Sequence, residues 1–379
     1  MAIFNLPLAI LLGYYSGMAP KAEKENKNTN QEVAKSNNDE HFTTTVRDTP
    51  IAVSPANLEK RFFYAFGDFL YWRADEDGLN YGQRLKSGTN DLTMREPDFR
   101  WSPGFRLGIG GQMGRFDQWD LTAMWTSLHS HAKGHTHTTL LPRWAPEILG
   151  ASAASGSVDW KLHYNVADLA LGRNFFVSRK LTVHPQLGLR GAWIFQDYDA
   201  KYLGEFASSF PSGLNEFTLP SSFDGDVHFR GVGLRLNCDL AYHFTPNFAL
   251  FGNIAGALFY GWFDVREKFK GFFNQPAGSL VATSSGFHHD FQRTRANLEG
   301  GIGILVEGDL SRAIHIGFSV KYEFSEWFNQ NMLADAILVP KIFQSNNTDV
   351  VQIVNTNRAQ ENGGNLGLQG LTAELRLDF

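Results

Sequence analysis

The last nine residues of the chain, 371–379, read LTAELRLDF and decide the fold. Their odd positions carry apolar side chains, and the even positions carry Thr, Glu, Arg and Asp. This period of two predicts a β-strand with one apolar face and one polar face. A soluble β-sandwich can show the same pattern with its apolar face turned inward, so alternation alone leaves a sandwich and a membrane barrel open.

The same alternation recurs upstream, near residue 100 and over 181–195, 232–242 and 314–324. These segments exceed the five or six residues that are typical of strands in globular sheets. They reach the roughly nine to eleven residues that a tilted strand needs to cross a bilayer. Their length therefore favours strands that span a membrane.

The connections between strands carry the stronger argument. Ten strands are predicted, at about 61–74, 98–113, 118–131, 158–177, 180–203, 226–243, 247–269, 288–306, 312–328 and 366–379. The gaps alternate between long (75–97, 132–157, 204–225, 270–287, 329–365) and short (114–117, 178–179, 244–246, 307–311). Long loops on one side and short turns on the other are typical of outer-membrane barrels with both termini in the periplasm. Greek-key sandwiches have no reason to sort their loops in this way. We therefore predict an all-β fold, a transmembrane antiparallel up-and-down β-barrel of about 10 strands (range 8 to 14), over residues 61–379.

The composition excludes several classes of protein. The 379 residues include 32 Phe and 37 Gly, while only 19% are charged, below the roughly 25% usual in soluble domains. A single Cys cannot form an intramolecular disulfide, and a net charge of -5 gives no electrostatic reason to expect a nucleic-acid partner. The mean hydropathy of -0.26 argues against a helical membrane protein but not against a barrel. The apolar run 248–263 has Asn253 as its one polar side chain besides glycines, and it falls below the roughly 18 residues of a spanning helix.

Aromatic residues gather near the ends of the predicted strands. Such amphipathic rings suit the level of the lipid headgroups, and we predict interface girdles formed by Tyr71, Trp72, Trp101, Trp119, Trp125, Trp160, Tyr164, Trp193, Tyr202, Tyr260, Trp262, Tyr322 and Trp327. Ordinary core aromatics are the alternative. A strand that bends round a narrow barrel uses glycine on its inner face, and by register those glycines are Gly104, Gly108, Gly110, Gly233, Gly301 and Gly303.

The N-terminus has a different character. Residues 3–12 are apolar and are followed by small residues at 16–19, which predicts a signal peptide over 1–19. A buried N-terminal strand is the alternative. The segment 20–60 is rich in Lys, Glu, Asn and Thr with few large apolar residues, and we predict a polar disordered tail there.

Charged residues inside the predicted strands mark the face where function should be sought. By register, the pore-lining candidates are Arg100, Arg106, Asp120, Arg190, Arg235, Asp239, Arg293, Arg295, Glu299, Lys321, Glu323, Glu374 and Arg376. Such charges either pair across the lumen and plug it, or line a wet channel and set its ion preference. Basic residues outnumber acidic ones in this set, which suggests a mild preference for anions.

Two other groups of residues give weaker indications of phosphate or metal binding. Gly108, Gly110, Gly111 and Gly114 resemble a phosphate-binding loop, but a second strand follows them where that motif needs a helix. The cluster of His129, His131, His135 and His137 could bind Zn or Cu if the chain folded back, and a polar loop at the mouth of the barrel is the favoured interpretation.

An enzymatic site lacks a recognisable pattern. His163, Asp168 and His315 are candidates for acid-base chemistry, but no spacing links them. Cys238 falls on the apolar face of its strand, which favours packing over reactivity. We therefore expect no catalytic residues, no cofactor and no resident metal.

Several stretches resemble a known family. They are Gly67–Ala74 (GDFLYWRA) with Asp77-Gly78-Leu79, Trp101–Arg106 (WSPGFR), Trp119-Asp120-Leu121, and Leu366–Thr372 (LGLQGLT). The chain resembles, over about 61–379, the MOMP-like outer-membrane proteins of Legionella and the chlamydia-related bacteria. The resemblance implies a pore-forming protein, abundant at the surface of a Gram-negative cell. Phe379 also resembles the C-terminal aromatic residue that outer-membrane barrels present to their assembly machinery. The chain departs from the family in lacking the many cysteines that cross-link chlamydial proteins, and in its 21–60 tail.

The expected function is that of an outer-membrane porin through which small polar solutes or ions diffuse. A non-conducting structural or adhesive surface protein is one alternative, and a barrel enzyme acting on lipid or peptide is another. Conduction does not follow from the fold, because eight strands are filled by their own side chains and sixteen leave a clear channel. The expected partners are outer-membrane lipid, small solutes and the assembly machinery, with an oligomer possible and no nucleic acid.

Overall fold

The computed structural model describes residues 63–85, 91–113, 119–144, 152–210, 213–274, 280–311, 313–345, 348–361 and 363–379. Chain contacts divide the protein into two units, Met1–Thr49 and Pro50–Phe379. The predicted signal peptide and the predicted tail lie outside the described residues. Within the described ranges, no helix has the length and apolar character needed to span a membrane.

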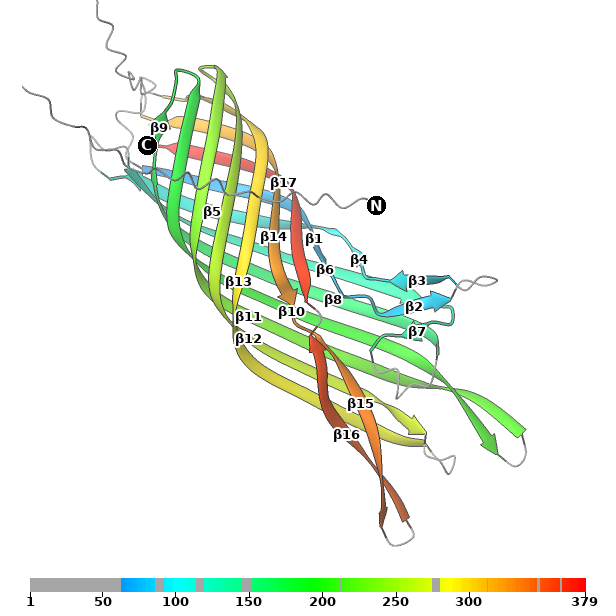
Figure 1. Cartoon of the computed structure of the whole chain (residues 1–379). Coiled ribbons are helices and arrows are strands. Elements are labelled where there is room, and N and C mark those ends of the chain that lie inside the picture. Colours follow the sequence, from blue (N-terminus) through cyan, green and yellow to red (C-terminus); the bar gives the residue numbers. More distant parts are fainter. Residues whose placement is uncertain are drawn as a thin grey trace, which may run out of the picture. The chain divides into compact units, whose positions relative to one another are not determined.

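Ten antiparallel strands form a closed barrel, which confirms the predicted fold and strand number (Figure 1). They are β1 (Phe63–Glu76), β5 (Trp101–Gln112), β6 (Trp119–Thr136), β8 (Ala153–Arg173), β10 (Leu181–Phe210), β11 (Gly213–Thr245), β12 (Phe248–Asn274), β13 (Leu280–Asp309), β14 (His315–Asn331) and β17 (Gly364–Asp378). Each strand pairs with the next in this order, and β17 pairs with β1 to close the ring. No strand edge of the barrel is therefore left open.

The prediction of loops is wrong for several segments, because these segments contain strands. Both 204–225 and 270–287 continue the hairpins β10–β11 and β12–β13. The other long connections hold a three-stranded sheet, β2 (Gly82–Leu85), β3 (Leu92–Arg95) and β7 (Leu141–Pro142), and a hairpin, β15 (Ala334–Ser345) with β16 (Thr348–Glu361). Two short strands, β4 (Asp98–Phe99) and β9 (Phe175–Phe176), pair with β6 and β10. Hairpins that extend beyond the membrane need no apolar outer face, so the alternation used for the prediction fades there.

The outer face of the barrel is an apolar band. Along β11, Leu234 and Leu236 are 62% and 64% exposed, whereas Arg235 between them is 6% exposed. In β17 the apolar side chains also point outward, since Leu371, Leu375 and Leu377 are exposed. Exposed apolar side chains on every strand of a closed barrel are what a lipid-facing surface requires.

Only part of the predicted aromatic girdle lies on this outer face. The exposed members are Tyr71, Trp101, Trp119, Trp125, Trp193, Tyr260, Trp262 and Tyr322. Among them, the rings of Tyr71 and Trp101 stack with their centroids 5.5 Å apart. The prediction is wrong for Trp72, Trp160, Tyr164, Tyr202 and Trp327, which are buried inside the barrel. These five have inward register positions, so they fill the interior instead of anchoring in lipid.

Two inward glycines make room for aromatic rings on the neighbouring strand. A Cβ atom at Gly108 would lie 2.1 Å from the ring of Phe66, and one at Gly110 would lie 2.2 Å from the ring of Tyr64. No side chain fits at such distances without displacing the ring. These glycines therefore serve packing inside the barrel, as their predicted position on the inner face suggested.

Beyond the apolar band, β10 and β11 carry carboxylates directly opposite one another. Asp197 pairs with Asp226 and Asp199 pairs with Asp224 in the register. Partial burial raises the pKa of the Asp199 carboxyl, and the facing carboxylate of Asp224 raises it further. Burial and then the charge of Asp197 raise the pKa of Asp226 in the same way.

This arrangement predicts a hairpin that is less stable at neutral pH than in mild acid. An aspartate whose pKa is raised on folding stabilises the fold below its unfolded pKa, and that contribution is lost as the pH rises through the folded value. The change Asp199→Asn should therefore stabilise the hairpin at pH 7 by about 0.5 kcal/mol and have little effect at pH 4. Amide hydrogen exchange over 197–226 at the two pH values measures this. Equal protection of wild type and variant at pH 7 would contradict it.

Candidate functional site: the barrel interior

The interior of the barrel is crossed by three polar clusters, beginning near the short connections. At that end, His184 on β10 lies with its Nε2 atom 2.7 Å from Asp120 Oδ1 on β6. Tyr64 on β1 donates its hydroxyl to Asp120 at 2.8 Å, and Gln186 donates to Asp239 on β11 at 2.9 Å. We call Tyr64, Asp120, His184, Gln186 and Asp239 the His184 cluster. It joins four strands, β1, β6, β10 and β11.

The second cluster is built around Arg106 on β5. Its guanidinium donates to Asp68 on β1 at 2.8 Å and to Glu323 on β14 at 3.3 Å. Glu323 also accepts from Lys321 at 2.9 Å and from the Thr372 hydroxyl at 2.5 Å. These five residues form the Arg106 cluster. Two strands lie between β5 and β14 in the sheet order, so the ion pair reaches across the curve of the wall.

The third cluster is centred on Arg190 on β10. Arg190 donates from Nε and Nη2 to the two oxygens of Asp168, at 2.6 and 2.9 Å, and it also contacts both oxygens of Glu299 on β13. Arg235 holds Glu299 at 3.0 Å, and Asn297 accepts from Arg190 at 2.9 Å. We call these five residues the Arg190 cluster. Two-point contacts between arginine and carboxylate fix both the distance and the orientation of the groups.

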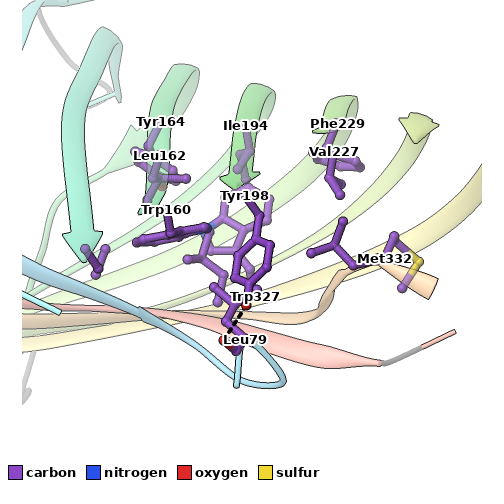
Figure 2. Packing of buried hydrophobic residues seen from close by; sticks show 14 of the residues in the cluster. Leu79, Trp160, Leu162, Tyr164, Ile194, Tyr198, Val227, Phe229, Trp327 and Met332 are labelled. Atoms are coloured by element: carbon purple, nitrogen blue, oxygen red, sulfur yellow. Dashed lines mark hydrogen bonds between the residues drawn. The ribbon is translucent and has the colours of Figure 1, made fainter. Parts of the chain in front are cut away.

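Aromatic side chains fill the interior on the far side of the Arg190 cluster. Trp327 on β14 is fully buried, with ring centroids 4.8 Å from Phe259, 6.0 Å from Tyr164 and 6.3 Å from Phe229. Figure 2 shows side chains of β8, β10 and β11 directed toward Trp327 and Leu79. We call Trp160, Tyr164, Phe229, Phe259, Phe263 and Trp327 the aromatic plug.

Segments from the long connections complete the plug. Leu79 and Tyr81 follow β1, and Trp144 follows β7; all three are buried. The carbonyl of Leu79 accepts the hydroxyl of Tyr198 at 3.1 Å, and the indole of Trp144 stacks on Phe223 with centroids 4.3 Å apart. The lumen in this structure is therefore occupied by ion pairs toward one end and by packed aromatic rings toward the other.

The predicted pore-lining residues occupy the inner face, with one exception. Arg106, Asp120, Arg190, Arg235, Asp239, Glu299, Lys321 and Glu323 belong to the clusters, and Arg293, Arg295, Glu374 and Arg376 take inward register positions. Arg100 does not, because its side chain is 61% exposed and Phe99 beside it packs on Trp160. The break between β4 and β5 shifts the alternation at that point.

Two interior residues were not predicted to line the lumen, although Asp168 was considered for acid-base chemistry. Asp68 and Asp168 are buried partners of Arg106 and Arg190. Both lie in alternating segments, and their register was the signal that could have found them. With Arg100 removed and these two carboxylates added, the predicted set holds seven acidic and seven basic groups, and the buried carboxylates Glu76, Glu267 and Asp378 add further acidic groups. The physical ground for an anion preference disappears.

The histidine cluster is not a loop and does not converge. His129, His131 and His135 lie on the exposed face of β6, because this strand runs on to Thr136. His129 faces His163 on β8 with centroids 4.7 Å apart, and His135 contacts His137 at 4.0 Å. Within the cluster His135 and His137 contact each other, whereas His129 contacts a histidine of β8, so the four imidazoles do not converge on one point. The predicted polar loop is corrected to a strand face for His129, His131 and His135.

One protein family and several solved structures are similar to this chain. The family described as "Legionella pneumophila major outer membrane protein precursor" matches residues 58–379. Among solved structures, the chain is similar to the outer membrane protease OmpT of Escherichia coli, with 11% identity, 85% of this chain and 98% of that chain covered, and a TM-score of 0.39. It is similar to Ail of Yersinia pestis, with 10% identity, coverage of 83% and 99%, and a TM-score of 0.22. It is also similar to the Pseudomonas putida toluene transporter TodX, with 10% identity, 88% of this chain and 93% of that chain covered, and a TM-score of 0.26. No curated protein matches the chain.

Proposed function

Because the chain belongs to the Legionella pneumophila major outer membrane protein family over residues 58–379, we propose that it is a porin-like protein that passes small polar solutes or ions across the outer membrane. The observation that carries the proposal is the inner face of the closed barrel, where charged groups of both signs line the wall. The resemblance to pore-forming proteins of this family supports it. The resting state is closed, since the clusters and the aromatic plug occupy the lumen.

Conduction then requires movement of side chains, and the openings should be small and infrequent. When the ion pairs within the Arg106 and Arg190 clusters separate, their charged groups remain along the wall. The aromatic plug, in contrast, must move aside as a packed unit. The plug is the larger barrier, because its packed rings present mostly apolar surface to a passing hydrated ion.

The aromatic plug specifically favours a second function, that of a non-conducting surface protein with structural or adhesive roles. Its side chains belong to one cluster of buried hydrophobic residues inside the barrel, and the hairpin β10–β11 extends well beyond the apolar band. We expect no enzymatic activity, because the buried carboxylates Asp168 and Glu299 are held by arginines and not presented to a substrate.

A planar bilayer separates the two functions. We expect the purified protein to give rare steps of low conductance without a preference for anions, because the inner face holds at least as many acidic as basic groups. A clear preference for anions in a salt gradient would contradict that count. If neither the wild type nor a variant with a weakened plug gives steps, the porin proposal fails and the surface-protein function stands.

The orientation and assembly of the barrel are part of the proposal. We propose that the short connections and both chain termini face the periplasm, and that Phe379, which is exposed on the outer face, is presented to the assembly machinery. The change Phe379→Ser should lower the amount of folded protein in the outer membrane several-fold, because an exposed apolar end group is lost. Cell fractionation and surface labelling measure it, with the change Phe318→Ser on the same face as the control.

A further inference from the structure

We propose that the outer wall of the barrel carries a divalent transition-metal site formed by Asp264 on β12 with His288 and Asp290 on β13. The His288 Nε2 atom lies 3.2 Å from Asp264 Oδ1 and 3.2 Å from Asp290 Oδ1. All three ligand atoms lie within 4.8 Å of one another. Nothing in the porin proposal requires this site, so the two stand independently.

The spacing suits a metal ion. Zinc binds imidazole nitrogen and carboxylate oxygen at roughly 2.0–2.2 Å, so two ligands of a tetrahedral site lie about 3.4 Å apart. The two distances from His288 are close to that value before any ion is present. A donor set of one imidazole and two carboxylates suits zinc and similar divalent transition metals, with water in the remaining positions.

The strand pairing explains why the ligands converge. Asp264 and Asp290 are direct partners in the β12–β13 register, and His288 precedes Asp290 by two residues on the same face. Like charges directly opposite on paired strands are destabilising. A hydrogen bond from His288 Nε2 serves one carboxylate at a time, whereas a cation between the three groups would neutralise both. Because the ligands stand on paired strands and not on a loop, the site is preorganised.

The surroundings leave the site accessible. Asp264 lies two residues after Trp262 on β12, at the edge of the apolar band, and both Asp264 and Asp290 line a groove of about 580 Å³. His228 on β11 is the register partner of Asp264, and it lies on the same face as a candidate fourth ligand. The groove gives water or a small anion access to the metal.

One neighbour opposes metal binding and thereby provides a sharp test. Arg266 donates to both oxygens of Asp264, at 3.0 and 2.7 Å. Its positive charge competes with a cation for that carboxylate. Removing the charge should therefore tighten binding, an outcome that no merely structural role for these residues predicts.

The experiment is a titration of the purified, chelator-stripped full chain with Zn²⁺ in detergent, in competition with a chromogenic zinc chelator. We expect one site in the wild type that weakens at least tenfold in His288→Ala and in Asp290→Asn. Arg266→Gln should bind roughly three- to tenfold more tightly. The control His135→Ala removes an exposed histidine from β6 and should leave this site unchanged.

The substituted side chains are exposed, so the barrel should fold in every variant, which far-ultraviolet circular dichroism checks. Equal affinity in the wild type and His288→Ala would overturn the proposal. So would loss of the site in His135→Ala, since the zinc would then be held by the histidines of β6. Unchanged or weaker binding in Arg266→Gln would also count against it.

Discussion

Replacing Arg190 with alanine will destabilise the barrel by about 3–5 kcal/mol, the cost expected when one partner of a buried ion pair is removed. Arg190 is 4% exposed at its side chain, and it holds Asp168 and Glu299 at once. Without it, two buried carboxylates face each other with Arg235 as the remaining cation of the cluster. Urea unfolding of the refolded protein in lipid vesicles, followed by tryptophan fluorescence, measures the loss.

The controls for Arg190 separate charge from packing. Arg230→Ala, on the exposed outer face of β11, should change the free energy of unfolding by no more than about 0.5 kcal/mol. Arg190→Lys should lie between the wild type and the alanine variant, because lysine keeps the charge but not the two-point contact. A loss in Arg190→Ala no larger than that in Arg230→Ala would mean that water fills the lumen around the cluster.

The second large effect is expected at the centre of the aromatic plug. Trp327→Ala should cost about 3–5 kcal/mol in stability, because it leaves a cavity among Tyr164, Phe229 and Phe259. It should also raise the single-channel conductance or the open fraction several-fold, because the ring fills the interior between facing walls. Planar bilayer recording and urea unfolding of the same preparation give both quantities.

Trp193→Ala is the matched control for the plug, since Trp193 is 42% exposed on the outer face of β10. It should leave conductance unchanged. If Trp327→Ala loses stability but conducts like the wild type, the Arg106 and Arg190 clusters form the barrier instead. The combination of Trp327→Ala with Arg190→Ala would then be needed to open the pathway.

The strands could be predicted because lipid imposes a strict rule on their outer faces. Where that rule applies, as from Val232 to Tyr242, the predicted and observed register agree. It stops at the edge of the apolar band, so the outer parts of β10 and β11 were predicted as a loop. The histidines of β6 were placed in a loop for the same reason.

The interior was predicted less completely, because the sequence pattern tells which face a side chain takes but not what it meets there. Arg190 was assigned to the lumen, yet its contact with Glu299 depends on the curvature of a closed sheet. Trp327 was assigned to lipid, because an aromatic residue at a strand end looks the same whether it points outward or inward. Only the alternation of inward and outward positions, followed along the strand to Trp327, would have distinguished an inward from an outward ring.

The seam between β1 and β17 has a consequence for how the chain folds. Tyr64 pairs with Asp378, and the backbone of Phe63 exchanges hydrogen bonds with that of Phe379, more than 300 residues away in sequence. Contacts of such high sequence separation are slow to form. The cylinder cannot close until the final residues have been synthesised, and a chain interrupted before β17 would retain two unpaired edges with a tendency to aggregate. Closure of the barrel therefore has to follow synthesis of β17, and β1 has no final partner until that strand is available.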